Sequence, residues 1–243
     1  NPSVDDLLLQ SFDIYQQTQG VFDPTLGDLN LRWGFSVAAQ PIKPLSQPEI
    51  KRSLAQSGFE HMQRIKPQVW RKKQAGLKLD FGAIAKGLAI DKGIEKLEQL
   101  GIKHAIINAG GDMRILGDHG DKPWSVAVRH PRKQTPLGWF KVSQNKSVVT
   151  SGDYERFYIF NGKRYHHIID PQTGEPATAS ISVTVTAPTA AQADALSTAM
   201  FILGAKKGVP IIEKMPHVEA IWVDRNQVVH QSSGMKLAFH MSD

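Results

Sequence analysis

The sequence predicts an α+β fold in which a mixed, mostly antiparallel sheet carries flanking helices. Short β-prone runs separated by turn residues dominate the middle and the end of the chain. Apolar residues at helical spacing occur in only a few segments between these runs. The chain shows no internal repeat, low-complexity tract or clear linker. A strand-rich sequence interrupted by a few helices is typical of α+β proteins, and we expect one domain over residues 1–243.

The helices are expected where an apolar stripe begins at a capping residue and stops at a glycine. These segments are Ser3 to Gly20, Ser46 to Gly58, Ala83 to Gly101, and Thr189 to Leu203 with a continuation to about Met215. Pro48 fits the first turn of the second helix, where a proline sacrifices no hydrogen bond. Between the first two helices, Phe22 to Thr25 and Gly27 to Phe35 are expected to form a loop rich in glycine and aromatic residues.

The strands are expected where β-branched and aromatic residues alternate or form short apolar runs. Residues 59–80 are strand-like, with turns at Lys66-Pro67 and Ala75-Gly76. The further strands expected are His104 to Asn108, Met113 to Leu116, Trp124 to Val128, Trp139 to Val142, Ser147 to Thr150, a hairpin after Phe157, Ile181 to Thr186, Ala220 to Val223, Val228 to Gln231 and Leu237 to His240.

Charge and composition restrict the kinds of partner. The net charge is +6, but Lys and Arg are scattered except for the run 71–73, so we expect no nucleic-acid partner. The mild basicity favours a phosphorylated small molecule or simply supports solubility. The absence of cysteine excludes disulfides, thiolate nucleophiles and zinc–cysteine sites. The sequence contains no run of about 18 apolar residues, so it predicts no transmembrane segment. No signal peptide is seen, although a processed N-terminus would hide one.

Residues 157–176 are the most informative stretch of the chain. Asn161-Gly162 is the favoured two-residue turn of a hairpin, and the return strand ends at His166, His167 and then Asp170-Pro171. Titratable groups at the point where a strand breaks into a loop are a common site of chemistry. The alternative is a structural His pair, with Asp170 bonded to its own turn.

The segment LDFGAIAKG, residues 79–87, places Asp80, a glycine turn and Lys86 at the start of a helix. A helix N-terminus attracts phosphate through its unpaired amides, and Lys86 would add a positive charge. The alternative is that Asp80 only caps the helix and that Gly87 only permits close packing.

Two weaker motifs follow. In INAGGDMR, residues 107–114, paired glycines could bring the backbone close to a ligand, and Asn108 and Asp112 could bond to a sugar or base edge. A plain glycine turn explains the same residues. In TSGDYERF, residues 150–157, hydroxyls and a glycine at a strand end could line a phosphate or carboxylate pocket. Ser151 lacks the surrounding nucleophile-elbow pattern, so a serine hydrolase is not expected.

The helix segment ADALSTAM, residues 193–200, places Asp194 and Thr198 on one face with Ser197 beside them. Their neighbours are small or apolar, so this face meets the protein, and a buried aspartate there needs a partner. A carboxylate, a hydroxyl and a backbone carbonyl would suit a hard cation such as Mg²⁺. The alternative is an ion pair between Asp194 and an arginine.

Taken in order, these motifs resemble the ApbE family of FAD:protein FMN transferases. The residues that carry the resemblance are FDPT…WGF, LDFGAIAKG, INAGGDM, TSGDYERF, YHHIIDPQTGEP and ADALSTA, from about Gly20 to Gly204. The resemblance implies an ApbE-like, T-fold-like architecture and a Mg²⁺-dependent enzyme. Such an enzyme transfers FMN from FAD to a Thr or Ser hydroxyl of an acceptor protein, through a phosphoester bond, and releases AMP.

The resemblance also implies roles for individual residues. The metal ligands would be Asp194, Thr198 and the carbonyl of Ala83, and His167 would be the base that activates the acceptor hydroxyl. The contacts to FAD would come from Val21, Phe22, Asp23, Asp80, Lys86 and the backbone near Ile168. The acceptor would be a flavoprotein subunit or domain with a Ser/Thr-Gly-Ala-Thr-type site.

Two departures from the family pattern qualify this expectation. The N-terminal segment that supplies early strands and a flavin-stacking aromatic residue is not expected in this chain, and Ala83 stands where some relatives have a hydroxyl residue. Two alternatives stay open: an FAD pyrophosphatase that gives FMN and AMP, and a non-catalytic flavin-binding module. The resemblance suggests a periplasmic protein, or a lipoprotein anchored to the membrane and facing the periplasm.

Overall fold

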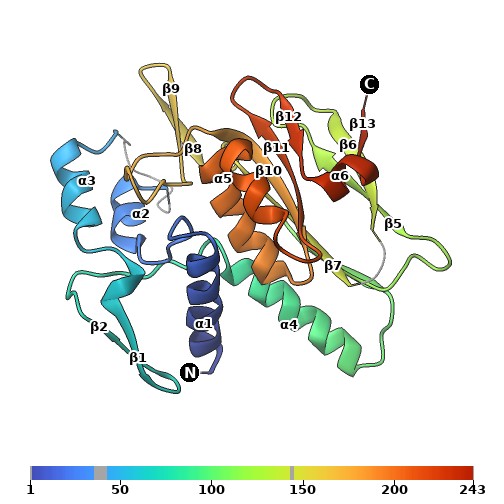
Figure 1. The fold of residues 1–243 in the computed structure, drawn as a ribbon, viewed down its shortest axis with the longest axis horizontal. Coiled ribbons are helices and arrows are strands. Elements are labelled where there is room, and N and C mark those ends of the chain that lie inside the picture. Colours follow the sequence, from blue (N-terminus) through green and yellow to red (C-terminus); the bar gives the residue numbers. More distant parts are fainter. Residues whose placement is uncertain (1, 36–42, 143–144, 243) are drawn as a thin grey trace. The chain divides into compact units, whose positions relative to one another are not determined.

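The structure of the chain is a computed structural model that describes residues 2–35, 43–142 and 145–242. The chain folds into two compact units. The first unit comprises Asn1–Ala83 and Asp153–Thr178, and the second comprises Ile84–Gly152 and Ala179–Asp243. Figure 1 labels the helices and strands of both units.

A six-stranded sheet forms the centre of the second unit. In spatial order its strands are β12 (Val229–Gln231), β11 (Glu219–Asp224), β10 (Ser180–Ala187), β7 (Lys146–Gly152), β4 (Asp112–Leu116) and β3 (Ala105–Ala109). Every neighbouring pair of these strands is antiparallel. All eight residues of β10 are buried, as expected for a central strand covered on both faces.

Two helices pack on this sheet. Helix α5 (Ala190–Ile212) lies against β10 and β7, and α4 (Ala85–Gln99) lies against α5, β3 and β4 (Figure 1). The helical geometry of α5 breaks at Gly204, whose φ is 69°, so the predicted stop at this glycine is confirmed and a further helical stretch follows it. By length and composition α5 could also cross a membrane, but half of its most apolar window is buried inside the protein. Its packing on the strands is that of a core helix.

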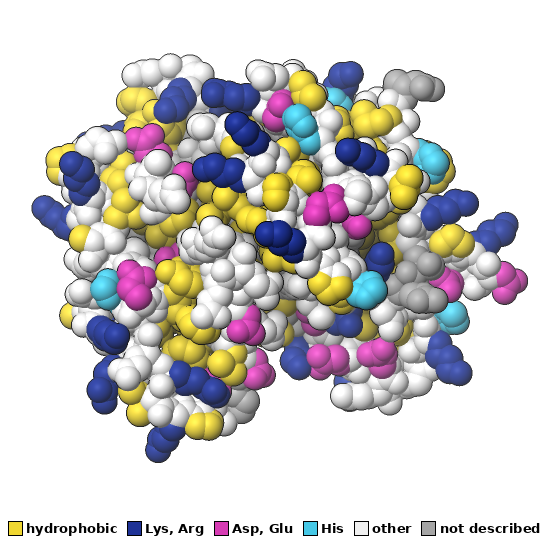
Figure 2. Space-filling view, viewed as in Figure 1, with side chains coloured by type: hydrophobic (Ala, Val, Ile, Leu, Met, Phe, Trp, Pro, Cys, Tyr) yellow, Lys and Arg dark blue, Asp and Glu magenta, His cyan; other side chains and the backbone are white. Residues whose placement is uncertain are grey.

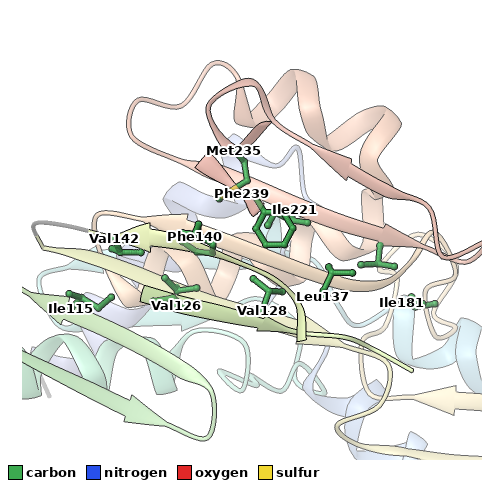
Figure 3. Packing of buried hydrophobic residues seen from close by; sticks show 12 residues of the cluster. Ile115, Val126, Val128, Leu137, Phe140, Val142, Ile181, Ile221, Met235 and Phe239 are labelled. Carbon is green, nitrogen blue, oxygen red and sulfur yellow. The ribbon is translucent and has the colours of Figure 1, made fainter. Parts of the chain in front are cut away.

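A second, three-stranded sheet completes the core of the second unit. In spatial order it consists of β13 (His240–Met241), β6 (Pro136–Val142) and β5 (Trp124–Arg129), and α6 (Ser233–Ala238) directly precedes β13 in the chain. Figure 3 shows Val126, Val128 and Phe140 of this sheet packed with residues of the larger sheet such as Ile221. The hydrophobic core therefore joins the two sheets, as in other face-to-face sheet packings.

The first unit combines short helices with two hairpins. Its elements are α1 (Pro2–Gln17), α2 (Gly27–Trp33), α3 (Gln47–Leu54), the 3₁₀ helix η1 (Phe59–His61), β1 (Met62–Lys66), β2 (Val69–Lys72), β8 (Phe157–Phe160) and β9 (Lys163–His166). Its core contains Leu29, Trp33, Ile50 and Ile169, and the Trp33 indole donates a hydrogen bond to the carbonyl of Gly174 at 2.9 Å. This bond ties α2 to the turn after β9.

The expected α+β class with antiparallel sheets and flanking helices is confirmed. Three local expectations were wrong. Of residues 59–80, expected to be strand-like, only Met62–Lys66 and Val69–Lys72 form strands, and Phe59–His61 form the 3₁₀ helix η1. Residues 27–33, expected within a loop, form α2, which ends at Gly34 in the left-handed conformation. Most of the stretch from Leu237 to His240, expected as a strand, belongs to the end of α6 and its cap, and only His240 begins β13.

The basic residues of the surface are dispersed. On the face drawn in Figure 2, Lys and Arg side chains alternate with acidic and hydrophobic ones. This agrees with their scattered positions in the sequence, where the net charge is +6.

Candidate functional site

Asp194 is the buried centre of the candidate site in the second unit. It lies in the second turn of α5, is 5% exposed, and its Oδ2 accepts a hydrogen bond from the backbone N–H of Gly87 at 3.0 Å. Gly87 approaches α5 so closely that an added Cβ would lie 2.3 Å from the carbonyl oxygen of Ala190. The glycine in LDFGAIAKG therefore brings the start of α4 to the carboxylate.

The electrostatic environment of Asp194 is unusual for a carboxylate. Burial, and after it the charge of neighbouring Asp112, raises the pKa of Asp194 to about 7, because the Gly87 N–H and Lys86 only partly oppose these effects. Two buried carboxylates and one lysine leave an excess of negative charge, which favours a bound cation.

Asp112 and Lys86 form an ion pair beside Asp194. Asp112 is 3% exposed and opens β4 directly after Gly110 and Gly111, whose φ values are 66° and 102°. Asn108 Oδ1 accepts the Gly111 N–H at 2.9 Å and closes this turn. The glycines therefore shape a hairpin that positions Asp112, and these contacts commit Asn108 to the turn and Asp112 to Lys86.

Three hydroxyl groups adjoin Asp194 on the α5 side of β7. Ser151 Oγ lies 2.8 Å from Ser197 Oγ and 3.3 Å from Thr198 Oγ1, and the Ser197 hydroxyl donates to the Asp194 carbonyl at 2.9 Å. Ser151 is therefore part of a hydroxyl network around Thr198. Sequence spacing indicated the Asp194–Thr198 face but could not indicate that β7 supplies Ser151.

The donor set fits a hard cation. Asp194 offers a carboxylate in a site with excess negative charge, and Thr198 offers a hydroxyl one turn further along α5. Oxygen ligands of this kind suit Mg²⁺. Within the described residues no group of three His, Cys, Asp or Glu side chains could bind a metal, so any cation here would depend on hydroxyl, carbonyl and water oxygens.

Asp91 fixes the position of α5 against α4. Its two carboxylate oxygens accept the N–H groups of Ala190 and Ala191 at 2.8 and 2.9 Å, and Arg114 donates to it at 2.6 Å. The arginine pair considered for Asp194 is thus found at Asp91. The capping carboxylate comes from another helix, which local sequence could not indicate.

In the first unit, the loop expected to contact FAD is tightly bonded. Asp23 Oδ1 accepts from the Thr25 backbone N–H at 2.8 Å and its hydroxyl at 2.6 Å, and Thr25 Oγ1 accepts the Gly58 N–H at 2.6 Å. Burial raises the pKa of Asp23 more than the Thr25 hydrogen bonds lower it. The side chains of Val21 and Phe22 are buried.

Asp80 is held at both oxygens in the first unit. Asn30 Nδ2 donates to Oδ2 at 2.8 Å, and the Gly82 N–H donates to Oδ1 at 2.8 Å. Asn30, a residue not singled out from sequence, comes from α2. Asp80 therefore closes a turn before α4, and Ala83 follows as the last residue of this segment of the unit.

The two histidines of the hairpin have different environments. His166 is 4% exposed; it accepts the Ile168 N–H at Nδ1, so its Nε2–H donates to the Ala177 carbonyl at 2.9 Å. His167 is half-buried, and its Nδ1 lies 3.2 Å from the Arg156 carbonyl oxygen. A proton on Nδ1 satisfies that contact and places the lone pair on Nε2, the tautomer that a general base requires. His166 is structural.

Two turns position the histidine-bearing strand β9, one before it and one after it. Asn161 and Gly162 have positive φ, as the predicted two-residue turn between β8 and β9 requires. Asp170 Oδ1 accepts the Gln172 N–H at 2.8 Å, so Asp170 is bonded to its own turn. Both backbone polar groups of Ile168 have partners within the unit, with Ala177 donating to its carbonyl at 2.9 Å.

The predicted site residues thus fall into two sets. The second unit brings together Lys86, Asp194 and Thr198, and the first unit contains Val21, Phe22, Asp23, Asp80, Ala83, His167 and Ile168. Within these sets the features define an α+β protein with an acidic and hydroxyl-lined site suited to a cation, and with a half-buried histidine whose Nδ1 contacts a backbone carbonyl.

Comparison with known proteins assigns this class of protein to a family. The model of the ApbE family matches residues 1–222, and the chain belongs to the ApbE family. The FAD:protein FMN transferase of Treponema pallidum is 35% identical over 94% of this chain and 67% of its own length. That of Rhodobacter capsulatus is 35% identical over 84% of this chain and 39% of its own length, and that of Escherichia coli K12 is 34% identical over 86% and 61%.

Solved structures agree with this assignment. The ApbE protein of Thermotoga maritima superimposes with a TM-score of 0.91 at 33% identity, covering 98% of this chain and 78% of that one. The flavin transferase ApbE of Vibrio cholerae gives a TM-score of 0.85 at 27% identity, covering 96% and 75%. The chain therefore spans between 39% and 67% of the curated relatives above and about three quarters of the solved ones.

Proposed function

We propose that the protein transfers FMN from FAD to a Thr or Ser hydroxyl of an acceptor protein. The hydroxyl oxygen attacks the phosphorus of the FMN half, a phosphoester bond forms, and the P–O bond to AMP breaks. The hydroxyl proton passes to the enzyme and AMP leaves with the electron pair of the broken bond. The family match over residues 1–222, with curated relatives named FAD:protein FMN transferase, is the observation that carries this proposal.

His167 is the proposed base. A neutral hydroxyl is a poor nucleophile, so a base within hydrogen-bond reach accelerates its attack. The Nδ1 contact with the Arg156 carbonyl favours the tautomer in which Nε2 accepts the hydroxyl proton. The carbonyl also stabilises the imidazolium that results, since Nδ1 keeps its proton.

Asp194 and Thr198 are the proposed protein ligands of Mg²⁺, together with the carbonyl of Ala83. The carboxylate of Asp194 supports this role, because it is buried and its negative charge is only partly compensated by Lys86 and the Gly87 N–H. When bound, Mg²⁺ supplies charge neutralisation at the diphosphate, which is the main requirement of phosphoryl transfer.

The proposed contacts to FAD are Val21, Phe22, Asp23, Asp80, Lys86 and Ile168. Lys86 supplies a positive charge at the start of α4, where a helix N-terminus attracts phosphate. The internal hydrogen bonds of Asp23 and Asp80 keep their loops rigid, which lowers the entropy lost on binding. The side chains of Val21 and Phe22 are buried and their N–H groups donate to Thr18, so their contact to FAD would use the backbone carbonyl groups.

One incubation separates the candidate functions. The protein, FAD and Mg²⁺ are mixed with an acceptor domain that carries a Ser/Thr-Gly-Ala-Thr-type site. Flavin fluorescence on the acceptor band of a denaturing gel supports the transferase. AMP and free FMN without labelled acceptor indicate an FAD pyrophosphatase, and unchanged FAD leaves a flavin-binding module. An acceptor whose Thr and Ser are replaced by Ala is the matched control.

We also propose that the protein works at the periplasmic side of a membrane, as a periplasmic protein or a lipoprotein. This rests on the family resemblance alone. Fractionation of cells that express the protein from its complete gene tests it, and recovery with cytoplasmic markers would contradict it.

A further inference from the structure

Lys86 and Asp112 differ sharply in their exposure although they form one ion pair. The side chain of Lys86 is 47% exposed, whereas that of Asp112 is 4% exposed. The Thr150 N–H also donates to Asp112 Oδ1, at 3.4 Å, and the double-glycine turn precedes Asp112 in the chain. The carboxylate is therefore the fixed partner, and the lysine is the flexible one.

We propose that Asp112 is a positioning residue that holds the Lys86 ammonium ready for the diphosphate of FAD. This inference rests on the proposed function. An ammonium group has three N–H donors, so a lysine held by one carboxylate still has donors for phosphate oxygens. A free lysine loses much rotamer entropy when it binds, and Asp112 removes most of that loss beforehand.

A second ion pair between α4 and β4 has a structural role and provides a comparison. Asp91 of α4 pairs with Arg114 of β4, just as Lys86 of α4 pairs with Asp112 of β4. In the Asp91–Arg114 pair the side chains are only 6% and 15% exposed, and Asp91 caps α5. Of these two pairs, Lys86–Asp112 is the one that presents its cation to solvent, as a ligand contact requires.

The negative charge of Asp112 acts on a bound phosphate in the opposite direction. A carboxylate near a phosphate repels it, so removal of Asp112 would tighten phosphate binding if charge alone mattered. Loss of positioning acts in the other direction. The sign of the change in affinity therefore separates the two roles.

The test compares the dissociation constants of FAD and riboflavin, which share the flavin ring but differ in phosphate. Both are measured by flavin fluorescence with Mg²⁺ present. Asp112→Asn should weaken FAD binding about tenfold, the size typical of a lost orienting partner, and leave riboflavin within twofold. Asp112→Ser serves as a second variant if the amide is not accommodated. In a Lys86→Met background, Asp112→Asn should have no further effect.

Glu95→Gln, which breaks the exposed Lys92–Glu95 ion pair of the same helix, is the control and should leave the FAD-to-riboflavin ratio unchanged. Unchanged or tighter FAD binding by both Asp112 variants overturns the inference, as does equal weakening of FAD and riboflavin. Weakening that persists in the Lys86→Met background also overturns it. A wild-type protein that binds FAD no tighter than riboflavin would instead contradict the proposed function itself.

Discussion

The backbone N–H of Gly87 donates to Oδ2 of Asp194 across 3.0 Å, and this bond joins the two helices of the candidate site. It depends on the close approach of α4 to α5, since a Cβ on Gly87 would lie 2.3 Å from the Ala190 carbonyl oxygen. Any outward movement of α4 lengthens the bond to the carboxylate. Helix packing and the position of Asp194 are therefore coupled.

Gly87→Ala should destabilise the protein by about 1–3 kcal/mol, the usual effect of overpacking against backbone. Urea unfolding measures the change. Gly93→Ala on the same helix is the control, because its Cβ would meet only the end of the flexible Ile107 side chain at 2.6 Å. The gain in helix propensity, up to about 1 kcal/mol, should offset that adjustment. Equal losses at both glycines would contradict the coupling.

Asp194→Asn should remove the stimulation of activity by Mg²⁺, because a ligand is lost, while leaving the fold intact. The amide can still accept the Gly87 N–H, and removing a charge buried beside Asp112 relieves repulsion. Thr198→Val, which keeps the side-chain shape, should raise the Mg²⁺ concentration for half-maximal activity about tenfold or more. Magnesium titration of the initial rate measures both effects. An Asp194→Asn protein with an unchanged titration would exclude Asp194 as a ligand.

His166→Ala should reduce the free energy of unfolding by roughly 2–4 kcal/mol. The substitution leaves the buried Ala177 carbonyl without its Nε2–H partner and the Ile168 N–H without its acceptor. Thermal unfolding checks this. His167→Ala, at a half-buried position, should have a clearly smaller effect, and the reverse order would refute the structural role of His166.

Asp28 should make the first unit sensitive to acid. Burial raises the pKa of Asp28, but hydrogen bonds from Lys78, Arg32 and Ser53 outweigh it, so the net pKa is well below 3.8. A carboxylate with a lowered folded-state pKa stabilises the protein above its unfolded pKa of about 4, and that contribution is lost as the pH falls further.

The corresponding variant is Asp28→Asn, which should lose about 1–2 kcal/mol at pH 7, a modest value because both cations are partly exposed. Urea unfolding at pH 7 and pH 3 should show the gap to wild type narrowing at the lower pH. Exposed Asp6→Asn is the control. A gap that stays constant with pH would contradict the assignment.

The elements predicted correctly from sequence are those that neighbouring residues along the chain determine. Asn161-Gly162 predicted its hairpin because only residues that tolerate positive φ fit that turn, and Gly204 predicted the break in α5 for the same reason. Helix α2 was missed, because its seven residues are stabilised by contacts such as Trp33 with Gly174. Such contacts join residues far apart in the chain.

In the candidate site, too, the sequence predicted the features that depend on local spacing and not the contacts between distant residues. Spacing along one helix indicated the face shared by Asp194 and Thr198. It could not show that Gly87 is the hydrogen-bond partner of Asp194, or that the considered arginine pairs with Asp91 instead. Nor could it distinguish His166 from its neighbour on local grounds, since only the contact of each ring with Ala177 or Arg156 separates them.

The central claim is that His167 activates the hydroxyl of an acceptor protein for FMN transfer. The most direct measurement is the initial rate at which flavin becomes covalently attached to an acceptor domain, compared between wild type and His167→Ala at saturating FAD and Mg²⁺. Loss of a general base predicts a rate lower by about 10²–10⁴-fold, with FAD affinity little changed. Flavin transfer by His167→Ala at the wild-type rate would contradict the claim.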